Sequence, residues 1–138
     1  MNKLSTLLLG VSLGLASLNV GAAMKVKITL DSGVYAATLE ENPTSQSFWQ
    51  QLPLESKLDN YSHNEKIFYP PTKLSTQNGT AYAGKTGDIT YYAPWGNVAM
   101  FFENGTPQPA QGLIYMGKFE GDLTALSQSK TIKFEKVE

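Results

Sequence analysis

The sequence contains no cysteine, no arginine and a single histidine, His63. Without cysteine, the chain can form no disulfide, use no thiolate nucleophile and offer no thiolate to zinc. One imidazole cannot build a histidine-rich metal site within one chain. All 11 basic residues are lysine, and lysine cannot replace the planar, permanently charged guanidinium of arginine. Mechanisms that need a thiol, a guanidinium or several imidazoles are therefore excluded.

The charge balance gives no sign of a polyanionic partner. The 138 residues carry a formal net charge of -1, and no basic stripe is present, so we expect no nucleic-acid partner. With 41% hydrophobic and 17% charged residues, the composition is that of one ordinary globular domain with enough chain to bury a core. We expect a monomer with no metal and no cofactor.

Residues 1–23 have the pattern of an export signal. Lys3 supplies a positive charge, residues 7–20 form an apolar stretch, and Val20-Gly21-Ala22-Ala23 provides the small residues of a cleavage site. The competing interpretation is a membrane anchor, but the apolar stretch is shorter than the roughly 20 residues that a spanning helix needs.

We therefore expect cleavage after Ala22 or Ala23. The mature domain would comprise residues 24–138 and be periplasmic or secreted. No second hydrophobic span follows the signal, so we expect the product to be soluble and free of the membrane.

Alternation of apolar and polar residues predicts strands through most of this domain. In residues 24–30, apolar side chains occupy every second position, which is the pattern of a half-buried strand. Loops are expected at residues 80–87 and 104–109. The further strands that we predict are residues 34–39, 54–58 and 67–69, a hairpin over 88–102, and residues 113–119 and 131–137.

Two short helices interrupt these strands. Asn42 or Thr44 can cap a helix that extends through Gln51, and Asp122 can cap another through Leu126. Seven or eight short strands with two short helices in one small domain favour a closed or nearly closed antiparallel barrel, because closure removes exposed sheet edges.

The most informative run is residues 87–102, in which two strand-like segments flank Pro94-Trp95-Gly96-Asn97. Proline fixes φ, and glycine and asparagine tolerate positive φ, so these four residues favour a tight turn. Neighbouring residues of a strand point to opposite faces. Tyr91 and Tyr92 therefore cannot both face the core, and the same holds for Phe101 and Phe102.

The run Gly-Asp-Ile-Thr-Tyr-Tyr-Ala-Pro-Trp-Gly-Asn at residues 87–97 resembles the bacterial cyclophilin-like domain family. Residues 71–76 and the helix segment 41–54 add to the resemblance, which extends over residues 24–138 in order. It implies a mainly β fold, a closed eight-stranded barrel with two short helices at its ends. Many members of the family are uncharacterised, so the resemblance carries the fold better than an activity.

One departure from the family bears on activity. Relatives commonly have Pro-Arg-Lys-Leu where this chain has Pro71-Thr72-Lys73-Leu74. Cyclophilin prolyl isomerases also use an arginine beside a hydrophobic proline pocket to favour the twisted amide, and this chain has none. Fold similarity alone therefore does not assign isomerase activity.

Aromatic side chains and two proline-rich loops, residues 70–76 and 104–110, suggest a ligand-binding cleft. Ordinary core packing is the competing interpretation of these aromatics. The candidate ligand-binding residues are Tyr92, Pro94, Trp95, Asn97, Phe102 and Lys73.

No residue is assigned a catalytic role. His63 and Glu65 could form an acid–base pair, but a lone histidine in a polar loop is usually solvated. Ser62 lacks the Gly-x-Ser-x-Gly setting of a nucleophile. Glu40-Glu41 precede a helix start and Asp88 enters a strand, so structural roles account for them.

These observations predict an exported, non-catalytic module that binds a small molecule or a peptide. A weak or atypical peptidyl-prolyl isomerase is the alternative from the enzyme class. A structural or partner-binding protein is the third possibility.

Overall fold

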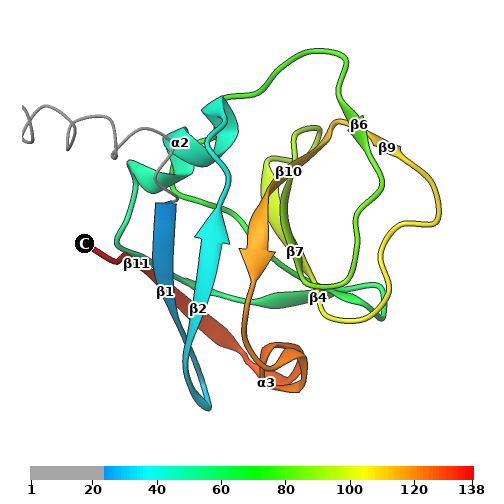
Figure 1. Ribbon diagram of the computed structural model, residues 1–138. Coiled ribbons are helices and arrows are strands. Elements are labelled where there is room, and N and C mark those ends of the chain that lie inside the picture. The colour runs from blue at the N-terminus through cyan, green and yellow to red at the C-terminus, as the bar shows by residue number, and fades with distance from the viewer. Residues whose placement is uncertain (1–23) are drawn as a thin grey trace, which may run out of the picture.

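A computed structural model describes residues 24–138 of the chain. One antiparallel sheet curls into a nearly closed barrel, and two short helices lie at its opposite ends (Figure 1). The expected export signal, residues 1–23, lies outside the described residues. Within the described part, neither helix has the length and apolar character needed to cross a bilayer.

The strands are β1 (Met24–Leu30), β2 (Gly33–Leu39), β3 (Leu54–Lys57), β4 (Asp59–Tyr61), β5 (Glu65–Phe68), β6 (Ala81–Tyr82), β7 (Asp88–Tyr92), β8 (Asn97–Phe101), β9 (Ala110–Gln111), β10 (Leu113–Phe119) and β11 (Thr131–Lys136). The helices are α2 (Pro43–Trp49) and α3 (Leu123–Gln128).

The strand order explains the closure of the barrel. The main sheet runs β3-β11-β1-β2-β10-β7-β8-β5-β4, so β3 and β4 are its two edges. Only Leu58 separates these two strands in the sequence, so the chain itself joins the two ends of the sheet. Counted as one bent strand, β3 and β4 make a barrel of eight strands. The predicted mainly β, eight-stranded barrel is confirmed.

Alternation along the strands fills the interior. In β1, Val26, Ile28 and Leu30 are almost fully buried, as their spacing predicted. Helix α2 inserts Phe48 into the same core, where its ring meets Phe134 of β11 edge-on with the ring centroids 5.0 Å apart. Such aromatic pairs add about 1 kcal/mol to the free energy of area burial.

Side-chain caps set the start of both helices. The carboxamide of Asn42 accepts a hydrogen bond from the backbone N–H of Ser45 at 2.8 Å. Asp122 likewise accepts from the N–H of Thr124 at 2.9 Å. Both caps satisfy N–H groups that have no partner within the helix. The first helix ends at Trp49, slightly earlier than expected, and the second continues to Gln128.

Three short strands, β4, β6 and β9, were not predicted. Ala81 and Tyr82 form β6, which pairs with β9 in a separate two-stranded sheet, although residues 80–87 were expected to form a loop. Strand β4 consists of three exposed residues. None of these three strands is long enough, or buried enough on one face, to show alternation. The structure consequently has more strands than the seven or eight predicted.

Candidate ligand-binding site

Strand β8 buries residues on both of its faces. Val98 and Met100 point into the barrel and belong to its core. Ala99 and Phe101 point the other way, yet they are 2% and 1% exposed and lie outside that core cluster. The outer face of β8 is therefore covered by a second layer of chain instead of solvent.

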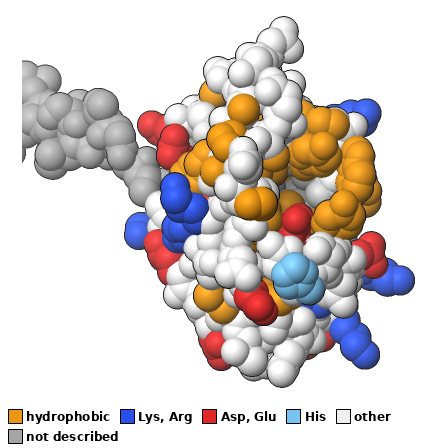
Figure 2. Space-filling model, turned by 90° about the vertical axis from the view of Figure 1, so that its right-hand side faces the viewer, with side chains coloured by type: hydrophobic (Ala, Val, Ile, Leu, Met, Phe, Trp, Pro, Cys, Tyr) orange, Lys and Arg blue, Asp and Glu red, His pale blue; other side chains and the backbone are white. Residues whose placement is uncertain are grey.

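A pocket with a volume of about 170 Å³ lies in this second layer. Figure 2 shows hydrophobic side chains gathered around a hollow on this side of the molecule. The residues that line the pocket are Tyr61, Glu65, Ile67, Tyr92, Trp95, Asn97, Ala99, Phe101, Thr106, Ala110 and Leu113.

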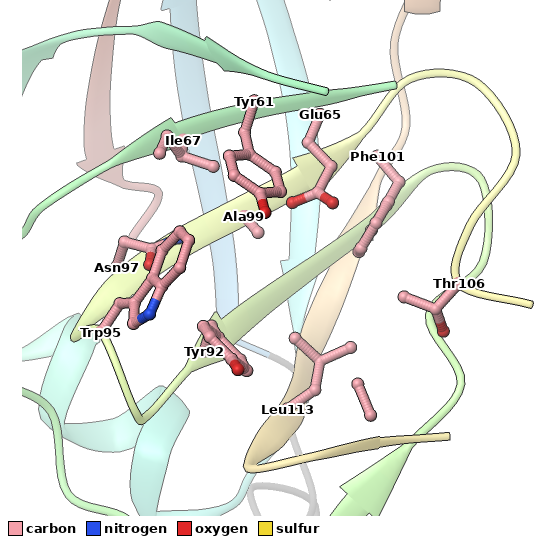
Figure 3. A pocket seen from close by; sticks show the side chains of 11 residues that line it. Tyr61, Glu65, Ile67, Tyr92, Trp95, Asn97, Ala99, Phe101, Thr106 and Leu113 are labelled. Atoms are coloured by element: carbon pink, nitrogen blue, oxygen red, sulfur yellow. The ribbon is translucent and has the colours of Figure 1, made fainter. Parts of the chain in front are cut away.

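The pairing register of the strands determines which side chains form the floor of the pocket. Ile67 of β5 lies opposite Ala99 of β8, and Glu65 lies opposite Phe101. Directly opposite residues of antiparallel strands share a face of the sheet. Leu113 of β10 extends the floor beyond β7. Figure 3 shows these side chains pointing from the strands into one space.

Three aromatic rings, which we call the aromatic wall, border the pocket: Tyr61, Tyr92 and Trp95. The indole of Trp95 meets the ring of Tyr61 at an interplanar angle of 85° with the centroids 5.3 Å apart. It meets the ring of Tyr92 at 77° and 5.5 Å. These edge-to-face contacts hold the indole in place, although Trp95 is 50% exposed.

The hairpin turn between β7 and β8 presents Trp95. The backbone N–H groups of Trp95 and Gly96 both donate to the carbonyl of Tyr92, at 3.2 and 2.8 Å. Gly96 has a φ of +78°, a conformation that side-chain-bearing residues rarely adopt. The predicted turn is present, and it ends where Asn97 begins β8.

Asn97, which borders the pocket, carries a buried hydrogen-bond acceptor without a partner among the described residues. The residue is 2% exposed, and its Nδ2 donates to the carbonyl of Val98 at 3.2 Å. That bond directs Oδ1 away from Val98, and Oδ1 has no hydrogen-bond partner among the described residues. A buried polar atom without a partner costs about 1–3 kcal/mol, so such an atom needs an explanation.

Glu65 is the charged group of the pocket. Its carboxylate points between Tyr61 and Phe101 (Figure 3). Partial burial raises the pKa of Glu65, because removing the carboxylate from water disfavours its charged form. Among residues 24–138, no lysine or histidine lines the pocket, and its other titratable side chains are Tyr61 and Tyr92.

A loop closes the pocket on the side away from β8. The hydroxyl of Thr106 accepts a hydrogen bond from the N–H of Gly84 at 2.8 Å, and the N–H of Thr106 donates to the carbonyl of Gly84 at 3.0 Å. Gly105 approaches the backbone of Gly84 so closely that a Cβ atom at position 105 would collide with it. The segments before β7 and after β8 are thereby joined.

Asp88 anchors this covering layer to the barrel. Its side chain is 1% exposed and bonds to Lys118 Nζ at 2.6 Å. The hydroxyl of Tyr82 and the N–H of Lys85 also donate to it, at 2.7 and 2.8 Å. Burial, together with the bond to Asp88, raises the pKa of Tyr82. A buried carboxylate in this position ties β6 to β7 and β10.

Comparison with protein-family models supplies the decisive observation. The model of the cyclophilin-like family matches residues 28–135, which is most of the chain. The chain belongs to the cyclophilin-like family. The resemblance noted in the hairpin run is thereby confirmed, and comparison with curated proteins finds no match.

A solved structure has the same kind of fold as this cyclophilin-like domain. The solution structure of a hypothetical protein from Archaeoglobus fulgidus superimposes with a TM-score of 0.66 at 19% sequence identity. The alignment covers 85% of this chain and 97% of that chain. At this identity the likeness concerns the fold alone.

The cyclophilin-like barrel brings three of the six candidate residues to the pocket, namely Tyr92, Trp95 and Asn97. Pro94 is exposed and faces a shallow surface hollow beside Gly112. Phe102 packs against the barrel core. The remaining three candidates, Pro94, Phe102 and Lys73, do not line the pocket.

Other polar residues singled out in the sequence lie away from the pocket or serve the fold. His63 is exposed, and its Nδ1 lies 3.3 Å from the hydroxyl of Ser62. Glu65 lines the pocket without His63. In the described part of the chain, no three acidic or histidine side chains are grouped closely enough to hold a metal ion.

Sequence reasoning missed several lining residues of this cyclophilin-like domain. Tyr61, Thr106 and Leu113 were not candidates, and Glu65 was considered only as a partner of His63. The alternation of β5 carried a usable signal, because Glu65 and Ile67 share one face while Lys66 and Phe68 share the other. Tyr61 and Thr106 reach the pocket through tertiary structure and leave no local pattern.

Proposed function

We propose that this cyclophilin-like protein is an exported module that binds a small ligand in the pocket between β8 and its covering layer. The observation that carries the proposal is the combination of a half-exposed aromatic wall with one carboxylate, Glu65, in the same pocket. Pockets for small ligands are typically lined by apolar and aromatic side chains with a few placed polar groups.

The energetics of the pocket support this reading. Exposed aromatic surface and an unsatisfied buried oxygen both raise the free energy of the empty protein. A ligand that covers Trp95 would remove the first of these costs. Simple core packing explains Phe101, which is fully buried, but it does not explain Trp95 at 50% exposure.

Binding without catalysis fits the side chains available. The pocket holds one carboxylate, Glu65, and no neighbouring imidazole, amine or thiol with which it could form an acid–base or nucleophilic pair in the described chain. The arginine expected of a cyclophilin-type isomerase is missing from the sequence.

Export rests on the sequence pattern of residues 1–23. Cleavage after Ala22 or Ala23 would leave Met24 as the first or second residue, and Met24 begins β1. The mature protein would then retain every strand of the barrel. N-terminal sequencing of the protein from the culture medium or periplasm tests this point.

A thermal-shift screen of small neutral and charged fragments tests the binding proposal. We expect fragments that raise the melting temperature of the native protein and have no effect on Trp95→Ala. Tyr69→Ala is the matched control, because Tyr69 is also exposed, at 54%, but does not line the pocket.

The control separates loss of the site from loss of an exposed aromatic. Fragments should stabilise Tyr69→Ala as much as the native chain. If hits stabilise Trp95→Ala equally well, the pocket is not the binding site and the proposal is wrong.

A further inference from the structure

Glu65 is the one charged side chain that lines the pocket among the described residues. None of the ion pairs between described residues involves its carboxylate. A carboxylate accepts hydrogen bonds and carries negative charge. It therefore favours a ligand that donates hydrogen bonds and is positively charged.

The aromatic wall favours the same charge. The faces of tryptophan and tyrosine rings carry partial negative charge and attract cations within about 6 Å. Aromatic rings around a carboxylate form an environment in which an organic cation is stabilised by both. No basic side chain of the described residues lines the pocket to compete for Glu65.

We propose that the ligand of this pocket is a small alkylammonium compound, whose N–H groups donate to the carboxylate of Glu65 while its carbon chain lies against the aromatic wall. This inference rests on the proposed function and specifies the substrate class. Because a quaternary ammonium has no N–H to donate to the carboxylate of Glu65, a protonated primary amine suits the site better.

The size of the pocket limits the ligand. A volume of about 170 Å³ is below the roughly 300–1,000 Å³ of pockets that bury drug-sized molecules. The floor residues Ile67, Ala99 and Leu113 are apolar and can contact a short carbon chain. A compound with a few carbon atoms and one terminal amine matches these dimensions.

Calorimetric titration with three probes tests the proposal. Butylammonium carries both the charge and the N–H groups, butanol has similar length without charge, and tetramethylammonium has charge without N–H groups. We expect butylammonium to bind at least about tenfold more tightly than butanol, since hydrogen bonds to charged groups contribute about 1.5–3 kcal/mol. Tetramethylammonium should lie between them.

Two variants assign the effect to the pocket. Glu65→Gln keeps the shape of the side chain and removes its charge, so it should weaken butylammonium binding about tenfold or more and leave butanol binding unchanged. Glu41→Gln is the matched control, because Glu41 is exposed and outside the pocket. Thermal unfolding of each variant verifies that it is folded.

The outcomes separate the two proposals. If butanol binds as tightly as butylammonium and Trp95→Ala abolishes both, the pocket binds ligands but the ammonium inference is wrong. If no probe or screened fragment binds in a Trp95-dependent way, the proposed function fails as well. A lysine residue with blocked termini serves as a further probe, because the ammonium group could belong to a protein side chain or to a free amine. Tighter binding than butylammonium indicates a lysine side chain of a protein as the ligand. Weaker binding indicates a free amine.

Discussion

The indole of Trp95 lies edge-on to the ring of Tyr61, with the ring centroids 5.3 Å apart. Trp95 stands in the turn between β7 and β8, whereas Tyr61 ends β4 at the edge of the sheet. The contact spans β5, which pairs with both β8 and β4. The aromatic wall is therefore a product of sheet pairing, and it borders the pocket only when the barrel is formed.

The pH dependence of stability should report the desolvation of Glu65. Burial raises the pKa of Glu65 in the folded protein above its unfolded value, so the folded state binds this proton more tightly. The free energy of unfolding therefore falls as the pH rises through the raised pKa. Glu65→Gln removes this loss, and we expect the variant to be more stable than the native protein at neutral pH.

Urea unfolding at several pH values measures this difference. Below about pH 4, Glu65 is protonated in both states, and the two proteins should have equal stability. A variant that is less stable than the native protein at neutral pH would show that the carboxylate is stabilised by the fold.

Ionised Asp31 should stabilise the folded protein, in contrast to Glu65, and this stabilisation should be lost at low pH. Its carboxylate accepts hydrogen bonds from the hydroxyl of Thr131 and from the backbone N–H groups of Lys130 and Thr131. These bonds, the Thr131 hydroxyl first, lower the pKa of Asp31 to about 2. The stability that they supply is present above the unfolded pKa, near pH 4, and is lost as the pH falls toward 2.

Comparison with Asp31→Ala tests this assignment by acid titration of unfolding. The native protein should be more stable at neutral pH, and the difference should shrink as the pH falls below about 4. A difference that stays constant down to pH 2 would mean that ionisation of Asp31 is irrelevant.

Removal of Lys118 should destabilise the protein, because its ion-pair partner Asp88 is buried. Lys118→Met leaves the carboxylate of Asp88 buried without its cation, although Tyr82 and Lys85 still donate to it. Removing one partner of a buried pair costs 3–5 kcal/mol, and the partial exposure of Lys118 reduces our expectation to about 2 kcal/mol. Urea unfolding measures the loss.

Lys57→Met is the matched control for that experiment. Lys57 is exposed and lies on β3 with no ion pair in the described chain. We expect its replacement to change stability by less than about 0.5 kcal/mol. Equal losses in the two lysine variants would remove any special role for the buried pair.

Phe48 should be among the most sensitive positions of the core. It is fully buried and contacts the rings of both Phe68 and Phe134. Phe48→Ala leaves a cavity at the barrel end, for which we expect a loss of about 3–5 kcal/mol. Gln50→Ala, at an exposed position just past the same helix, should be nearly neutral in the same unfolding assay.

Local sequence patterns were sufficient to predict most strands of the barrel but only some of the residues that line the pocket. Strand β1 could be predicted because every second residue is buried, and the turn at Gly96 because few residues adopt positive φ. Strands β4, β6 and β9 could not, since all three are short and depend on a partner strand. Strands of two or three residues contain too few positions to display a period.

The same distinction applies to the site. Tyr92, Trp95 and Asn97 lie within one hairpin, so their proximity follows from the turn. Tyr61 and Glu65 join them through the pairing of β4 and β5 with β8, which is a long-range property. The sequence alone also gave no sign that a second layer would cover the outer face of β8.

Nitrogen-15 NMR titration is the most direct test of the pocket as a ligand site. The protein has two tryptophans, Trp49 and Trp95, so their two indole N–H signals act as independent reporters. With butylammonium, we predict that the Trp95 indole signal and the backbone amides of Tyr61 and Asn97 shift together while the Trp49 signal stays in place. Saturating ligand that leaves the Trp95 signal unmoved, or shifts both indole signals alike, would contradict the account.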